Sequence, residues 1–179
     1  MGLVDAVGAY AKARDNLRAS LAASSTFQSW VDAADPTLAK ALARIHLSGT
    51  PAPTNGETYS VVEVTAMTPL AIIRTKTFVT RANTAVGAGA CYERGSDLIV
   101  DLLGPVDEAT AAVPAECGRL IDNVVSGIIT DLEALNGQPG YLAWRQIAIQ
   151  EEPERGEVGE LPTRGDQWQI RMIVTWMGI

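Results

Sequence analysis

The sequence is poor in the residues that build metal centres. It contains one histidine, His46, and two cysteines, Cys91 and Cys117, which do not stand in any zinc-ligand spacing. Without a second histidine or an H-E-x-x-H pattern, His46 is expected to be structural. Two isolated cysteines are typical of a reduced intracellular pair. We therefore expect no metal and no other cofactor.

Long apolar runs are also missing. No run approaches the roughly 18 residues that a membrane-spanning helix needs, and residues 1–20 lack a basic leader followed by an apolar core. Apolar residues make up 47% and charged residues 20% of the 179-residue chain, which is ordinary for a globular protein and too apolar for a disordered one. We therefore expect one domain over residues 1–179 and no membrane partner.

Lysine is absent after Lys76, and the charge is divided unevenly. The net charge is −7; residues 1–90 carry eight Lys/Arg and six Asp/Glu, whereas residues 91–179 carry six Arg and fifteen Asp/Glu. An acidic chain is poorly suited to gripping a phosphate backbone, which requires clustered cations. The division reflects either solvated faces or a subunit that stacks on itself or docks between partners of opposite sign.

Recognisable catalytic motifs are lacking as well. The chain has no G-x-S-x-G elbow and neither of the glycine-rich phosphate loops, although residues 82–90 are small and glycine-bearing. A gathering of His46 with at least two of Glu93, Asp97 and Asp101 in the fold would revive an enzyme hypothesis, and their dispersal would remove it. We expect that the protein is not an enzyme.

Two segments of the chain show the apolar periodicity of a helix. Apolar residues recur every three or four positions from Leu3 to Leu21 and again over residues 116–135, where Asn136-Gly137 ends the pattern. A second short helix capped by Ser24 or Ser25 follows the first, and a third begins at Asp35-Pro36. The N-terminal helices, within residues 1–47, lead into a first strand at residues 44–47.

Alternation and β-branched residues predict the strands. They cover residues 60–66, 70–81, 96–103 and 142–150, and a closing strand follows in which Trp168, Ile170, Met172, Val174 and Trp176 alternate with the polar residues Gln169, Arg171 and Thr175. The closing strand is therefore expected to be half-buried. The predicted fold class is α+β: a mainly antiparallel sheet packed against the long amphipathic helix at about 116–135 and the N-terminal helices.

The segment over residues 151–165 is acidic and polar. It lacks the ligand order of a calcium loop, so it is either a solvated loop or an interaction arm that presents negative charge to DNA or to a basic partner. Core packing is the default for Trp168 and Trp176, but Trp176 stands near the end of the chain and would meet a neighbour if the closing strand lies at a sheet edge. The candidate interface residues are thus Glu151, Glu152, Glu154, Glu157, Glu160, Arg164 and Trp176.

This order of elements resembles the tail-terminator and tail-completion proteins of long-tailed bacteriophages, and more loosely the neck proteins that join heads to tails. The resemblance rests on the N-terminal helix, the short helical insert, the strand with Ala43-Arg44-Ile45, the Thr-bearing strands of residues 60–81, the long helix and the two closing strands that end in Val174-Thr175-Trp176. It covers nearly the whole chain and includes no signature motif. The insert at residues 25–42 and the tract at 106–115 are longer than a minimal member needs.

The resemblance implies a non-enzymatic structural protein of the virion, present in the host cytoplasm during assembly. Such proteins form a ring of copies of themselves, usually a hexamer, on the head-proximal end of the tail tube. The ring stops tube polymerisation and offers the surface on which the head docks, so the implied partners are the tail tube protein and a head connector or neck protein. DNA would pass through the bore without specific binding. A head-completion or connector protein of the neck and, less closely, a binding adaptor unrelated to phage are the alternatives.

Overall fold

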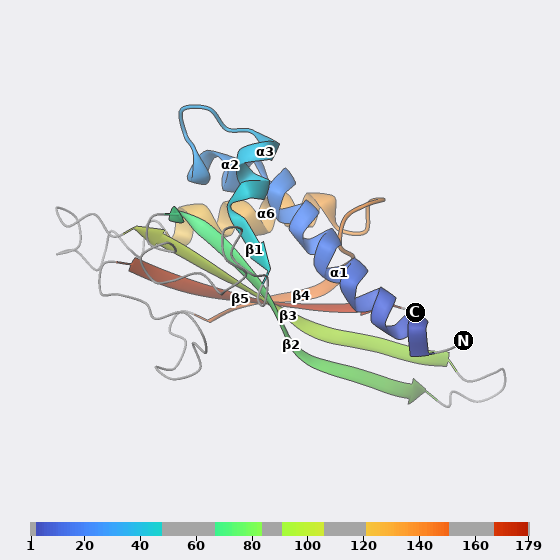
Figure 1. Ribbon diagram of the computed structural model, residues 1–179. Helices are drawn as coiled ribbons and strands as arrows, with labels where there is room; N and C mark the ends of the chain where they lie inside the picture. Colours follow the sequence, from blue (N-terminus) through green and yellow to red (C-terminus); the bar gives the residue numbers. More distant parts are fainter. Residues whose placement is uncertain (1–2, 48–66, 84–90, 106–120, 151–166, 179) are drawn as a thin grey trace, which may run out of the picture.

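The computed structural model describes residues 3–47, 67–83, 91–105, 121–150 and 167–178. Within these ranges, four α-helices lie together on one face of a five-stranded sheet, whose two longest strands are neighbours in the sheet (Figure 1). This is an α+β arrangement, as the sequence predicts. In chain order the elements are α1 (Leu3–Ala23), α2 (Ser25–Val31), α3 (Leu38–Ala43), β1 (Ile45–Leu47), β2 (Leu70–Asn83), β3 (Cys91–Pro105), the π-helical turn η1 (Ile121–Val125), α6 (Ser126–Leu135), β4 (Trp144–Gln150) and β5 (Gln167–Gly178).

The sheet has the spatial order β1-β2-β3-β5-β4. Strand β1 runs parallel to β2, and all other neighbours are antiparallel. The last strand, β5, therefore lies between β3 and β4 and is paired on both sides. The condition for a subunit contact through the closing strand, a position at the sheet edge, is therefore not met, because β4, which precedes β5 in the chain, occupies that edge.

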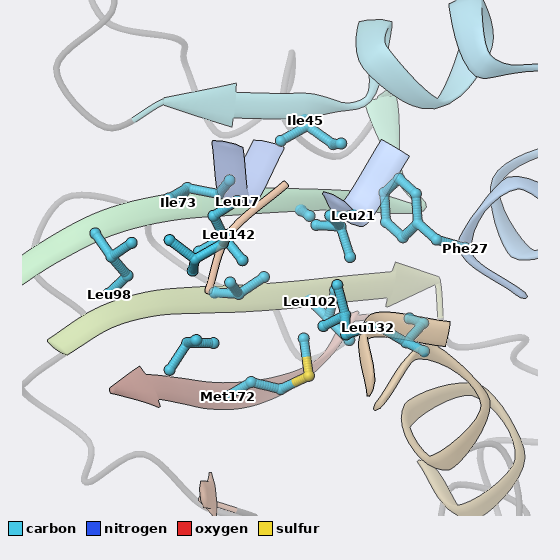
Figure 2. Packing of buried hydrophobic residues seen from close by; sticks show 14 of the residues in the cluster. Leu17, Leu21, Phe27, Ile45, Ile73, Leu98, Leu102, Leu132, Leu142 and Met172 are labelled. Carbon is cyan, nitrogen blue, oxygen red and sulfur yellow. The ribbon is translucent and has the colours of Figure 1, made fainter. Parts of the chain in front are cut away.

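Side-chain alternation gives the sheet two different faces. The face under the helices carries Ala71 and Ile73 from β2, with every second residue of β3 and β5 beside them. These side chains form the main core with α1, α2, α3 and α6 (Figure 2). Members with no measurable or almost no exposure are Leu17, Leu21, Phe27, Ile73, Leu98, Leu102, Ile128, Leu132, Ile170 and Met172.

The N-terminal helices confirm the sequence prediction except at the start of α3. Ser24 caps α2, because its hydroxyl accepts a hydrogen bond from the Phe27 amide at 3.1 Å. Helix α3 was expected to begin at Asp35-Pro36, but its N-cap is Thr37, whose hydroxyl accepts from the Lys40 amide at 3.4 Å. Asp35 instead pairs with the Lys40 ammonium group at 2.8 Å. The capping residue is therefore the one next to the apolar run.

The long helix predicted at 116–135 is not confirmed. Its described part is the π-helical turn η1 followed by α6, which has 10 residues. Adjacent residues of an α-helix point about 100° apart, yet Val124 and Val125 are both buried, which the wider π turn permits. The helix ends as predicted, since Asn136 follows α6 and Gly137 adopts a left-handed φ of 72°.

The two strands of the hairpin, β2 and β3, are both longer than predicted at its outer end. Strand β2 continues to Asn83 and β3 already begins at Cys91, and each residue of this outer part is in register with one on the other strand. Part of the small, glycine-bearing tract at 82–90 is thus strand rather than loop. The predicted strand at 60–66 and the acidic segment at 151–165 lie outside the described residues.

Candidate functional site

Most of the candidate interface residues cannot be placed. Glu151, Glu152, Glu154, Glu157, Glu160 and Arg164 all lie outside the described residues. Trp176 is described, and it belongs to the main core with 5% of its surface exposed. It stands opposite Trp144 of β4 and Ser96 of β3 in the register. Trp176 therefore fills the interior of its own chain, and its position gives no surface to a partner.

The face of the sheet turned away from the helices, here called the far face, carries a buried charge cluster. Asp101 of β3 and Arg171 of β5 stand directly opposite each other, and only 1% and 3% of their surfaces are exposed. The Arg171 Nε donates to Asp101 Oδ1 at 2.8 Å. Arg74 of β2 donates to the other carboxylate oxygen, Oδ2. One carboxylate thus joins the three central strands.

Apolar side chains surround this charge cluster. Leu70, Ile72 and Leu103 form a second buried group on the far face, with Met67 packed against it. Ions in such surroundings interact strongly, but they also lose their hydration. A carboxylate whose two oxygens each accept from an arginine is fixed as an acceptor. The arrangement is therefore suited to locking the register of β2, β3 and β5 rather than to proton transfer.

The sequence pattern predicted Arg171 incorrectly. Alternation with apolar residues placed it on the polar side of a half-buried strand, yet it is as buried as its core-facing neighbours. Thr175, four residues after Arg171, is also engaged on the far face, where its hydroxyl donates to Asp97 Oδ1 at 2.8 Å. The only signal in the sequence was the presence of Asp97 and Asp101 inside an apolar strand, and their partners depend on strand order.

His46 lies in β1, at the other end of the sheet. The register places it opposite Ile72, which in turn stands opposite Asp101, so one of the three candidate carboxylates shares its row. Asp97 and Glu93 lie further along β3 toward the hairpin tip. The enzyme hypothesis required His46 to lie beside at least two of these carboxylates. The register instead places it in the row of one of them, Asp101.

The surroundings of His46 are cationic. Burial lowers the pKa of its imidazole, and the nearby Arg18 and Arg44 guanidinium groups lower this pKa further. Both arginines are held by backbone carbonyls: Arg18 Nη2 donates to Leu42 at 3.1 Å, and Arg44 Nη1 donates to Met67. These bonds tie α1 to α3 and Arg44, just before β1, to Met67, which precedes β2, and this fits the structural role expected for His46.

A second polar cluster joins the helices to one another. Asp131 of α6 accepts three hydrogen bonds at Oδ2, from the Ser24 hydroxyl at 2.7 Å, the Thr26 amide at 2.9 Å and the Ser25 hydroxyl at 3.2 Å. Burial raises the pKa of this carboxyl, but the hydrogen bonds outweigh burial, and the pKa is lowered overall. Gly127, one turn earlier, allows Thr26 to approach α6 closely. The carboxylate therefore holds α2 on α6.

Metal and membrane features are not found in the ranges that the structure describes. No three His, Cys, Asp or Glu side chains among these residues come close enough to hold a metal ion. None of the helices there combines the length and apolar character needed to cross a bilayer. In comparisons with known proteins, no family model matches the chain and no curated protein matches its sequence. The functional argument therefore rests on this geometry and on the order of elements.

Proposed function

We propose that this chain is a structural protein of the phage virion that forms a ring at the head-proximal end of the tail tube. The ring would stop tube polymerisation and provide the surface on which the head docks. The observation that carries the proposal is the order and placement of the described elements: helix, helical insert, strand, long hairpin, helix and two closing strands, with the four described helices on one sheet face (Figure 1). The resemblance to tail-terminator proteins rests on this order of elements, together with the long helix at 116–135, of which η1 and α6 are described, and the Thr-bearing strands of residues 60–81, of which residues 60–66 lie outside the described residues.

Two further features support a structural role. Two polar side chains of the described region serve the fold: the buried Asp101 joins three strands, and the partly buried Asp131 joins two helices. The hairpin of β2 and β3 continues for three residue pairs, from Arg81–Glu93 to Asn83–Cys91, past the end of the pairing between β3 and β5. This outer end of the hairpin is suited to reaching a neighbouring subunit.

The test is disruption of the gene in the phage that encodes this chain, followed by negative-stain electron microscopy of the lysate. We expect filled heads accompanied by detached tails of uncontrolled length, and we expect normal particles to return when the intact gene is supplied from a plasmid. Detached tails of normal length beside leaking heads would instead assign the protein to the head side of the neck. Intact infectious particles would refute both structural roles and favour an adaptor.

A further inference from the structure

The sheet has two edges that are open in the described part of the chain. At one end, β4 pairs with β5 on one side and has no strand on the other. At the opposite end, β1 covers β2 only from Ala71 to Ile73. From Arg74 to Asn83, β2 continues with β3 on one side and no described strand on the other. Unpaired strand edges present rows of free N–H and C=O groups to any strand that approaches.

Strand β4 carries little of the protection usual for an edge. Natural edges are blunted by lysine, proline, bulges or short length, and β1, with 3 residues, is protected by its length. Strand β4 has 7 residues, without proline or lysine, and its one charged residue, Arg145, lies at the irregularity between Trp144 and Gln146. The stretch from Gln146 to Gln150 is regular and uncharged, and Ile149 is 45% exposed. The β4 edge is therefore suited to pairing with a further strand.

The two open edges also differ in charge. Beyond Arg74, which is paired with Asp101, the sequence of β2 carries Lys76 and Arg81 and no acidic residue. Strand β4 leads directly into residues 151–160, which contain five glutamates and one arginine. Opposite charges on two surfaces favour encounter and fix which surface meets which. The chain is therefore biased toward joining unlike edges rather than two copies of the same edge.

We infer that β4 of one copy adds to the open edge of β2, over residues 74–83, in a second copy. The sheet would then continue from subunit to subunit through main-chain hydrogen bonds, as in other cases of strand addition. Because the two edges are different, a row of joined copies always has a free β2 edge at one end and a free β4 edge at the other. Closing the row into a ring pairs these last two edges with each other. The inference deepens the proposed function and rests on it, since it names the strands through which the ring subunits join.

The experiment blocks each edge separately with proline, which removes a backbone donor. In an edge strand paired antiparallel on one side, successive N–H groups alternate between the paired strand and the open side. Ala148→Pro and Ile149→Pro in β4 are therefore a matched pair, one of which removes only an outward N–H. Val79→Pro and Thr80→Pro are the corresponding pair in β2. From each pair, the variant that keeps the wild-type circular dichroism and unfolding midpoint is taken forward.

Masses are measured by light scattering after size exclusion, for the purified full-length chains alone and mixed. We expect the wild type to exceed the monomer mass of 19.0 kDa several-fold, and each blocked variant alone to fall to 19.0 kDa. An equimolar mixture should form a heterodimer of twice that mass and nothing larger, because the β4-blocked copy still offers β2 and the β2-blocked copy still offers β4. This complementation distinguishes the pairing of unlike edges from a general loss of assembly.

Three results would overturn the inference. A wild-type chain that stays at 19.0 kDa at all concentrations would do so, as would blocked variants that still assemble like the wild type. Assembly of one blocked variant alone, with the other monomeric, would mean that two copies of the same edge pair. None of these outcomes decides the proposed function, which the gene disruption tests independently through the length of the tails.

Discussion

The buried cluster on the far face leads to an unequal prediction for its two fully buried members. Asp101→Asn and Arg171→Met both remove the same 2.8 Å ion pair. The first change takes the shared carboxylate from two arginines and turns an amide NH2 toward one of their guanidinium groups. The second leaves Asp101 paired with Arg74 and fills the vacated space with an apolar chain of similar length. We therefore expect the aspartate variant to be clearly the less stable.

The magnitudes follow from burial. Asp101 and Arg171 side chains are 2% and 4% exposed, so water replaces little of what is lost. Removing one partner of a buried pair costs about 3–5 kcal/mol, which we expect for Asp101→Asn. Losing one hydrogen bond to a charged group costs about 1.5–3 kcal/mol, which we expect for Arg171→Met. Because whole domains are stable by only about 5–15 kcal/mol, the aspartate variant loses a large fraction of its stability.

Urea unfolding followed by tryptophan fluorescence measures the difference, since the core residue Trp176 reports on unfolding. Wild type and variants are compared at one protein concentration and in the same oligomeric state. With a slope of about 1–3 kcal/mol per molar urea, the midpoint of Asp101→Asn should fall by about 1 M or more. Lys40→Met is the control: it removes two exposed ion pairs, to Asp32 and Asp35, and should leave the midpoint unchanged.

An equal or larger loss in Arg171→Met would refute the reasoning. It would mean that Arg74 does not hold the carboxylate when Arg171 is gone. A midpoint for Asp101→Asn within error of the wild type would be still more damaging, because the cluster would then contribute nothing that a neutral amide cannot replace.

Three more predictions concern the helical layer and β1. Asp131→Ala should destabilise the protein at neutral pH; because the folded pKa of Asp131 lies below 3.8, the wild-type advantage should be largest above pH 3.8 and shrink as the pH falls through the folded pKa. Gly127→Ala should lower the thermal midpoint, since its Cβ would lie 2.7 Å from Thr26 Cγ2, and Thr26→Ala should remove most of that loss. His46→Gln should abolish a loss of stability on acidification: the folded pKa is lowered, so the unfolded state binds more protons and wild-type stability falls as the pH drops below 6.5.

Each of these has its own contradicting result. Asp131→Asn, which keeps a neutral acceptor, should cost less than the alanine variant, and the reverse order would deny the hydrogen-bonding role. A Gly127→Ala protein that is more stable than the wild type would show that α2 shifts freely and that helix propensity prevails. For His46, identical stability profiles of wild type and variant between pH 7 and 5 would show that the imidazole has the same pKa folded and unfolded.

The elements that depend on local pattern were predictable. Helix α1, strand β2 and the turn at Asn136-Gly137 follow from periodicity, β-branched residues and a left-handed glycine, each of which acts within a few positions of the chain. The strand boundaries were underestimated at the hairpin, where small residues such as Ala82 have weak strand preference. There, pairing between β2 and β3 extends the strands beyond what their composition predicts.

What could not be predicted depends on strand order. Nothing in the local sequence says that β5 inserts between β3 and β4, so Trp176 was considered for a subunit contact and Arg171 for the solvent side. The cluster of Arg74, Asp101 and Arg171 exists because three strands from distant parts of the sequence become neighbours in one register. The open edge of β2 and the exposure of β4 follow from the same order, and both became visible only in the fold.

The insertion of β5 between β3 and β4 also has a consequence for the order of synthesis. The ribosome makes β4 before β5, yet among the described strands β4 pairs with β5 alone. At about 5–20 residues per second, the nascent chain spends on the order of seconds with β4 complete and its place in the sheet not yet formed. During that interval the facing edges of β3 and β4 are both unsatisfied. Newly made copies on a crowded polysome are therefore most exposed to mispairing just before β5 emerges, and this is the point at which a chaperone that shields strand edges would raise the yield of folded protein.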